Sequence, residues 1–196
     1  MAEINQHLKD ITEIRSMMER SSKVLSLSGL SGVSAGIAAL AGAWFAEWAI
    51  SSLKQSDLLA SITIDAAIVL LLGVSMAVVF SVRMARKKTL PIWTPTSRFL
   101  IVDLAIPLGA GGILCVALIQ YGAYSLIPGI MLMFYGLALI SGSKYALKEI
   151  RYLGLTELIL GCVAVFLPQH GLAIWASGFG IMHILYGSLM YFRYER

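Results

Sequence analysis

Six long apolar segments, separated by short polar stretches, dominate the pattern of hydrophobic and polar residues along the 196-residue chain. Each segment is close to the roughly 20 residues that a helix needs to cross about 30 Å of hydrocarbon, and the fifth segment is the shortest. We therefore predict an all-α, polytopic integral membrane protein with six transmembrane helices, at residues 27–50, 58–82, 98–120, 124–142, 152–168 and 171–192.

Residues 1–26 have a different pattern, in which apolar residues recur at helical spacing among four acidic and four basic side chains. This pattern predicts a cytoplasmic amphipathic helix that lies on the bilayer or on the protein's own cytoplasmic end. The mixed charge argues against a polybasic lipid-binding arm, so a docking helix for a cytosolic protein partner or for a second copy of the chain stays open. Residues 27–192 would form the transmembrane domain, and residues 193–196 a short cytoplasmic tail.

The composition agrees with a membrane protein, because 58% of the residues are hydrophobic and only 13% are charged, against about 25% in soluble domains. All Lys and Arg residues except Lys54 fall before the first segment, after the last one, or in the second and fourth connections. The positive-inside rule therefore predicts that both termini face the cytoplasm. Since the basic residues flank apolar segments, we expect membrane lipid and no nucleic acid as a partner.

A repeated element organises the second half of the chain. The sequence G-I-M-L-M-F-Y-G at residues 129–136 recurs as G-I-M-H-I-L-Y-G at residues 180–187. Glycines seven residues apart lie on one helix face and let another backbone approach closely. We predict three helical hairpins, of which the second and third are related, and a homo-oligomer held by glycine faces. The predicted packing glycines are Gly32, Gly36, Gly129, Gly136, Gly154, Gly161, Gly180 and Gly187.

Two resemblances follow from these motifs. The third hairpin, G-L-T-E-L-I-L-G-C-V-A-V-F-L-P-Q-H-G followed by G-I-M-H-I-L-Y-G, resembles the hairpin unit of the acid-resistance membrane protein family, and the likeness covers about residues 98–192. The opening I-R-S-M-M-E-R-S-S-K-V-L-S-L-S-G-L-S-G is similar, over residues 14–45, to uncharacterised bacterial six-span proteins. These resemblances imply a multi-pass protein of the bacterial inner membrane that is linked to stress or envelope adaptation. Neither one supplies catalytic residues.

Five ionisable side chains interrupt the apolar segments: Glu47, Asp65, Asp103, Glu157 and His183. Each charge costs roughly 2.5 to 3.5 kcal/mol inside hydrocarbon, so such residues usually face protein or a wet cavity. A helical rise of 1.5 Å per residue places Asp103, Glu157 and His183 roughly 8, 9 and 15 Å from the cytoplasmic ends of their segments. These three residues could share one cavity. The predicted binding residues for a proton, a cation or a small ligand are Asp103, Pro107, Glu157, His183 and Asp65.

Glu157 and His183 form the main candidate pair. Glu157 follows Gly154 by three residues and precedes Gly161 by four, and His183 has the same place in the 180–187 element. We hypothesise that these two glycine faces pack together and bring the carboxylate within reach of the imidazole. Such a pair could act as a proton relay or pH sensor. It could equally be a buried structural hydrogen bond that fixes the register of the helices.

Asp103 and Pro107 form a second candidate. A proline four residues after Asp103 cannot donate to the Asp103 carbonyl, which predicts a kinked or discontinuous third helix of the kind that transporters use at binding sites. Asp103 could then join Glu157 in a cation or proton site. The alternative is an interfacial acid that pairs with Arg98 or Arg151.

The remaining ionisable or amphipathic residues give weaker indications of a functional site than Glu157, His183 and Asp103 do. Glu47 stands between two tryptophans, which is typical of the membrane interface, and Trp175 also has the character of an interface anchor. Asp65 is deeper in its segment. It could pair with Lys54 or, if protonated, with a neighbouring carbonyl group.

The sequence favours a non-enzymatic protein. It contains neither a phosphate-binding glycine loop followed by Lys nor a His-Glu-x-x-His motif, so we predict no catalytic residues, no metal and no cofactor. The expected function is that of a stress-responsive or pH-responsive sensor or structural protein with a partner-binding N-terminal helix. The alternative is a small transporter or channel for protons, cations or a small solute.

Overall fold

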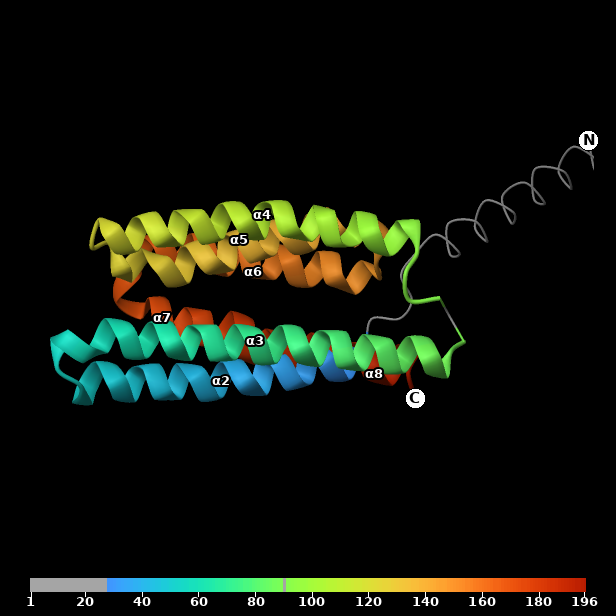
Figure 1. Cartoon of the computed structure of the whole chain (residues 1–196), viewed down its shortest axis with the longest axis horizontal. Helices are drawn as coiled ribbons and strands as arrows, with labels where there is room; N and C mark the ends of the chain where they lie inside the picture. Colours follow the sequence, from blue (N-terminus) through green and yellow to red (C-terminus); the bar gives the residue numbers. More distant parts are fainter. Residues whose placement is uncertain (1–27, 90) are drawn as a thin grey trace, which may run out of the picture.

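The computed structural model of the protein describes residues 28–89 and 91–196, and its long elements are all helices (Figure 1). The helix predicted over residues 1–26 lies outside the described residues. Five helical stretches are long and apolar enough to cross a membrane: Gly29–Ser52, Gln55–Lys87, Pro95–Gln120, Tyr124–Tyr145 and Pro168–Tyr194. The structure thus confirms an all-helical chain with several helices that can span a membrane.

The helices follow the predicted segments within a few residues. They are α2 (Gly29–Ser52), α3 (Gln55–Lys87), α4 (Pro95–Gln120), α5 (Ile127–Gly142), α6 (Lys148–Phe166), α7 (Gly171–Trp175), the π-helix η4 (Ala176–Met182) and α8 (His183–Tyr194). Helix α6 corresponds to the short fifth segment. It has 19 residues and contains Glu149, Arg151 and Glu157.

Local sequence explains several helix boundaries. Helix α4 begins at a capping box in which Thr94 Oγ1 accepts from the Ser97 backbone N–H and Ser97 Oγ accepts from the Thr94 N–H, with Pro95 at the first helical position. Past its last turn, Gly122 has a φ of 72°, a left-handed conformation that favours glycine. Helix α6 ends before Pro168, because a residue that precedes proline is restricted to extended conformations.

The helices form two groups, which Figure 1 shows one above the other. In the first group, α5 packs against both α4 and α6. In the second group, α2 packs against α3 and against the η4–α8 segment. We call them the α5 group (α4, α5, α6) and the α2 group (α2, α3, α7, η4, α8). The groups meet where α7 contacts α5 and α6 and where η4 and α8 contact α6.

Glycines hold the α5 group together. A Cβ atom placed on Gly136 would lie 2.6 Å from the Gly154 carbonyl oxygen, and one on Gly161 would lie 2.8 Å from the Gly129 carbonyl oxygen. Only glycine permits two antiparallel backbones to approach this closely. The glycine face of α5 is therefore matched to the glycine face of α6.

A second pair of glycine faces holds the α2 group together. A Cβ atom on Gly187 would lie 2.6 Å from the Gly29 carbonyl oxygen, and one on Gly36 would lie 2.7 Å from the Gly180 carbonyl oxygen. A Cβ atom on Gly32 would lie 3.1 Å from the Cα atom of Gly187. Gly29 and Gly36 are seven residues apart, so α2 carries the same glycine spacing as α5, α6 and the last helix.

These contacts correct one hypothesis. The glycine face of Gly154 and Gly161 does not pack on that of Gly180 and Gly187. Each face packs on a helix of its own group, because α5 and α2 supply matching glycines at the same spacing. The glycines named in these contacts lie where the backbones of two helices approach each other closely.

Basic residues gather at one end of the bundle, where α2, α4 and α6 begin and α3 and α8 end (Figure 1). There the Glu195 carboxylate accepts hydrogen bonds from the Gly29 N–H and from Ser28 Oγ, and the Lys88 ammonium donates to the Tyr194 carbonyl oxygen at 3.4 Å. We call this the basic end. The end of the chain is thereby tied to the start of α2 and the end of α3.

Candidate functional site

The backbone is irregular directly before His183. Residues Ala176–Met182 form a π-helix, and His183 is the first residue of α8. Short π-helical turns occur frequently at functional sites, because the extra residue shifts the direction of the following side chains. The His183 ring is buried, and its Nδ1 atom lies 3.1 Å from the carbonyl oxygen of Gly178.

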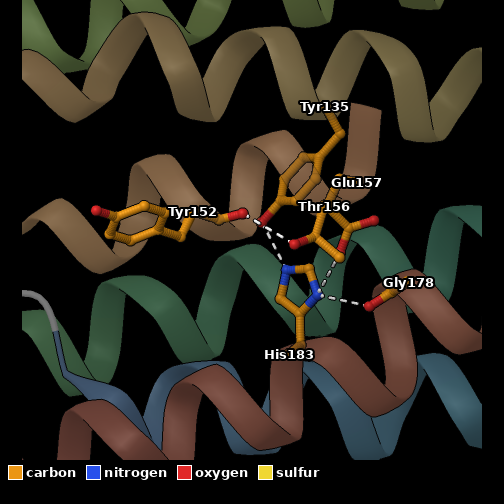
Figure 2. A network of polar contacts seen from close by, with 6 residues as sticks. All are labelled: Tyr135, Tyr152, Thr156, Glu157, Gly178 and His183. Carbon is orange, nitrogen blue, oxygen red and sulfur yellow. Dashed lines mark hydrogen bonds and ion pairs between the residues drawn. The ribbon is translucent and has the colours of Figure 1, made fainter. Parts of the chain in front are cut away.

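Glu157 approaches this histidine from α6. Its Oε1 atom lies 3.3 Å from His183 Nδ1, and the residue is 0% exposed (Figure 2). Neither carboxylate oxygen has a hydrogen bond to any residue in the described part of the chain. Gly178 makes room for the carboxylate, since a Cβ atom at that position would collide with Glu157 Oε2. A carboxylate with so few partners is costly to keep ionised unless the adjacent imidazole carries a proton.

Tyr135 of α5 completes the network from the other side of the ring. Its hydroxyl lies 2.8 Å from His183 Nε2 (Figure 2). The Gly178 carbonyl can only accept, so we assign a proton to Nδ1 of His183. Nε2 then accepts from the Tyr135 O–H when the ring is neutral and donates to the Tyr135 oxygen when the ring is charged. The network can therefore hold His183 in either protonation state.

Aromatic side chains enclose the histidine. The Phe179 ring stacks on His183 with 5.7 Å between centroids and 16° between planes, and the Trp175 ring lies 5.0 Å from Phe179. The Trp175 indole N–H is buried and has no hydrogen-bond partner among the described residues. Trp175, expected to anchor the chain at the interface, thus packs its ring inward. This apolar enclosure strengthens the interaction between Glu157 and His183.

The polar network lies at the contact between the two helix groups. Tyr135 and Glu157 belong to the α5 group, whereas Gly178 and His183 belong to the α2 group. Helix α6 contacts both η4 and α8 at this place. A proton gained or lost here therefore changes the charge at the surface along which the two groups meet.

Asp103 and Pro107 lie elsewhere. The Asp103 carboxylate is partly exposed and pairs with Lys144 Nζ at 3.7 Å, so its partner is a base of the basic end, although neither Arg98 nor Arg151. Helix α4 continues through Pro107, so the predicted discontinuity of the third helix is wrong, whereas the predicted kink stays a prediction. The irregular helix is instead the last one, at η4.

Asp65 is also separate from the Glu157 site. It lies on α3, and its carboxylate faces Gly42 of α2, where a Cβ atom would be 3.3 Å from Oδ2. The predicted pair with Lys54 is not formed, and Asp65 has no ion pair to another described residue. Glu47 is exposed between two exposed tryptophans, and its place at the membrane interface stays a prediction.

Sequence reasoning missed several residues at or near the site. The repeat could have indicated Tyr135, because it places Tyr135 and Tyr186 at equivalent positions. No comparable sequence pattern indicates Gly178 or Phe179. Glu149 was also missed. It is buried at the start of α6, two helical turns before Glu157, and it accepts hydrogen bonds from Arg193 and Tyr194.

Helix α2 contains a motif that resembles the nucleophile motif of hydrolases. The segment Gly32-Val33-Ser34-Ala35-Gly36 has the G-x-S-x-G spacing found at the nucleophile of many hydrolases. That nucleophile requires a sharp turn between a strand and a helix. Here the segment lies inside α2, and Ser34 Oγ donates to the Leu30 carbonyl oxygen at 2.9 Å, as an ordinary helical serine does.

Comparisons with protein-family models, with curated proteins and with solved structures find no match to this chain. The resemblance to the acid-resistance membrane protein family therefore stays a prediction. In the described part of the chain, no three His, Cys, Asp or Glu side chains come together as a metal site. The chemistry that the site offers on its own residues is proton binding by a carboxylate, an imidazole and a phenol.

Proposed function

We propose that this chain is a non-enzymatic, proton-responsive membrane protein in which the protonation of Glu157 and His183 controls the packing of the α2 group against the α5 group. The observation that carries the proposal is the contact between these two side chains, both buried, at 3.3 Å across the two groups. A change in external pH would change the charge of Glu157 and His183 at this contact.

The charge of the pair explains how it would respond. With one proton, the pair of Glu157 and His183 is neutral overall, as an ion pair or as two neutral groups. With two protons the pair carries one positive charge, and with none it carries one negative charge. A net charge is costly in an apolar interior, so the packed arrangement is favoured over an intermediate pH range and weakened on both sides of it.

We further propose the topology and setting that the sequence indicates. Six transmembrane helices in three hairpins would place both termini in the cytoplasm of a bacterium, with the chain in its inner membrane. Residues 1–26 would bind a cytosolic partner. A second copy of the chain could pack on α4, where Gly109 and Gly112 have open space around them. A role in stress or envelope adaptation follows from the resemblance alone.

A distance measurement tests the proposed response. Spin labels would be attached to cysteines at the exposed positions Leu71 of α3 and Ile113 of α4, after replacement of the native Cys115 and Cys162 by Ala. We expect the distance distribution in nanodiscs to change between about pH 8 and about pH 5, the range in which His titrates. The same labels in the double variant Glu157→Gln/His183→Leu should show no change. An unchanged distribution in the wild type would refute the proposal.

A small transporter or channel for protons, cations or a small solute is the second candidate. Two observations favour it: both Glu157 oxygens lack hydrogen bonds among the described residues, and the helix beside them is irregular at η4. Flux into proteoliposomes separates the two functions. Proton or cation flux that Glu157→Gln abolishes would support transport, whereas flux-free protein with a pH-dependent structure supports the sensor.

A further inference from the structure

A second buried carboxylate lies at the basic end of the same helix pair. Glu149 Oε1 accepts hydrogen bonds from Arg193 Nη1 at 3.1 Å and from the Tyr194 hydroxyl at 2.8 Å. Glu149 Oε2 is buried and has no hydrogen-bond partner among the described residues. The Arg193 side chain is 57% exposed, so this cluster has one side in contact with solvent.

Glu149 and Glu157 are aligned along α6. They lie on its buried face with Leu153 midway between them, at steps of four residues, which corresponds to about 12 Å along the helix. Helix α8 runs alongside and presents His183 near one carboxylate and Arg193 near the other. The two carboxylates are thus connected by the same pair of helices.

Apolar side chains fill the space between the two polar clusters. Leu153 of α6 and Met190 of α8 are both buried, and they belong to one hydrophobic cluster. Water and protons do not cross such a layer unless the side chains move aside. The hydrophobic cluster that contains Leu153 and Met190 therefore separates Glu157 from the solvent that Arg193 reaches.

We infer that Glu149 is a proton-binding site that exchanges protons between solvent at the basic end and Glu157, and that Leu153 and Met190 gate the transfer. The inference rests on the proposed function and deepens it, because it gives the buried site a route for its ligand, the proton. Glu149 accepts a proton on its unbonded Oε2 while Arg193 and Tyr194 hold Oε1. It passes that proton inward when the apolar layer opens.

The charged and titratable groups around this route come from two helix groups. At Glu149 they are Arg193 and Tyr194 of α8, and at Glu157 they are His183 of α8 and Tyr135 of α5. Between the two, Tyr186 of α8 packs against the hydrophobic cluster. The other bases at the start of α6, Lys148 and Arg151, are exposed. Any effect of a variant on the route must therefore be measured with the net charge at Glu149 kept constant.

The fluorescence of Trp175 can report the protonation of His183 at the buried site. Its ring contacts Phe179, which stacks on His183, so its fluorescence should respond to the charge on His183. Replacement of the exposed Trp44, Trp48 and Trp93 by Phe leaves Trp175 as the only tryptophan. A stopped-flow pH jump on this full-length chain in nanodiscs then measures how fast the site equilibrates.

The double variant Glu149→Gln/Arg193→Gln removes the proposed relay without changing the net charge. We expect it to slow the Trp175 response at least about tenfold, with the midpoint pH close to that of the single-Trp parent. Leu153→Ala should accelerate the response, and Leu155→Ala, at an exposed position of the same helix, should not.

Each outcome has a distinct meaning. A parent that shows a pH-dependent signal, together with a double variant of unchanged rate, would overturn the route through Glu149 and leave the proposed function intact. A parent whose fluorescence does not change with pH would overturn both. Because Gln retains the shape of Glu and still accepts from Tyr194, a folded double variant is expected, and circular dichroism checks it. If that variant is unfolded, the rate in Glu149→Gln/Arg151→Gln, which also keeps the net charge at this end of α6 and should also be slow, decides.

Discussion

Glu157 Oε1 and His183 Nδ1 lie 3.3 Å apart, and the two residues belong to different helix groups. Within each group, paired glycines bring backbones together, and these contacts are apolar. Between the groups, this carboxylate and its imidazole form an ion pair in which both side chains are buried. The packing of the glycine faces within a group should therefore be insensitive to pH, whereas the packing between groups should depend on it.

Replacing Tyr135 by Phe should weaken the contact between the groups. The change removes the hydroxyl that lies 2.8 Å from His183 Nε2 and leaves that nitrogen without its partner in the described structure. We expect the free energy of unfolding in mixed micelles to fall by about 1 to 2 kcal/mol. Tyr186→Phe, at the equivalent position of the repeat, is the control and should cost less. Equal losses in the two variants would contradict the role given to Tyr135.

The contact between Glu157 and His183 could be predicted from the sequence, but the surface that makes it could not. Residues seven apart on a helix differ by about 20° in direction, whereas residues three apart differ by about 60°. Glu157 thus lies at the edge of the glycine face of Gly154 and Gly161. That face meets α5 while the carboxylate at its edge meets α8.

The choice of partner helix is what the sequence leaves undetermined. Helices α2, α5, α6 and the η4–α8 segment all carry glycines seven residues apart, so each face fits more than one neighbour. The irregular backbone at η4 has no signature comparable to a proline. A proline such as Pro107 is a recognisable signature, yet α4 remains helical there, because local adjustments of a transmembrane helix can satisfy the backbone group that the proline frees.

A methyl group at Gly136 should disrupt the α5 group. In Gly136→Ala the new Cβ atom would lie 2.6 Å from both the Gly154 carbonyl oxygen and the Leu158 amide nitrogen, and backbone cannot yield as a flexible side chain does. We expect a loss of roughly 1 to 3 kcal/mol in the free energy of unfolding. Gly109→Ala is the matched control, since no atom lies within 4 Å of its Cβ position. It should be neutral or slightly stabilising, and a loss as large as that of Gly136→Ala would refute the packing.

Glu195 should protect the start of α2. Its carboxylate accepts from the Gly29 N–H and from Ser28 Oγ, which satisfies a free donor at a helix N-terminus and places a negative charge there. Glu195→Ala should speed amide hydrogen exchange in the first turn of α2, by an amount that corresponds to about 1 kcal/mol. Arg196→Ala, one residue further, should leave this exchange unchanged. Unaltered exchange in Glu195→Ala would show that the cap does not form.

The central claim is that Glu157 and His183 together set a pH optimum for the packing of the two groups. The direct measurement is the free energy of unfolding against pH for the wild type, His183→Leu, Glu157→Gln and the double variant, which supplies the baseline for all other titrating groups. Relative to that baseline, the wild type should be most stable at an intermediate pH and lose up to about 1.4 kcal/mol per pH unit on each side.

Each single variant should lose stability in only one direction of pH. In His183→Leu, the lone Glu157 carries charge only when it is deprotonated, so stability should fall only as pH rises. In Glu157→Gln, the lone His183 carries charge only when it is protonated, so stability should fall only as pH drops. Four profiles that run parallel across the pH range would contradict the account.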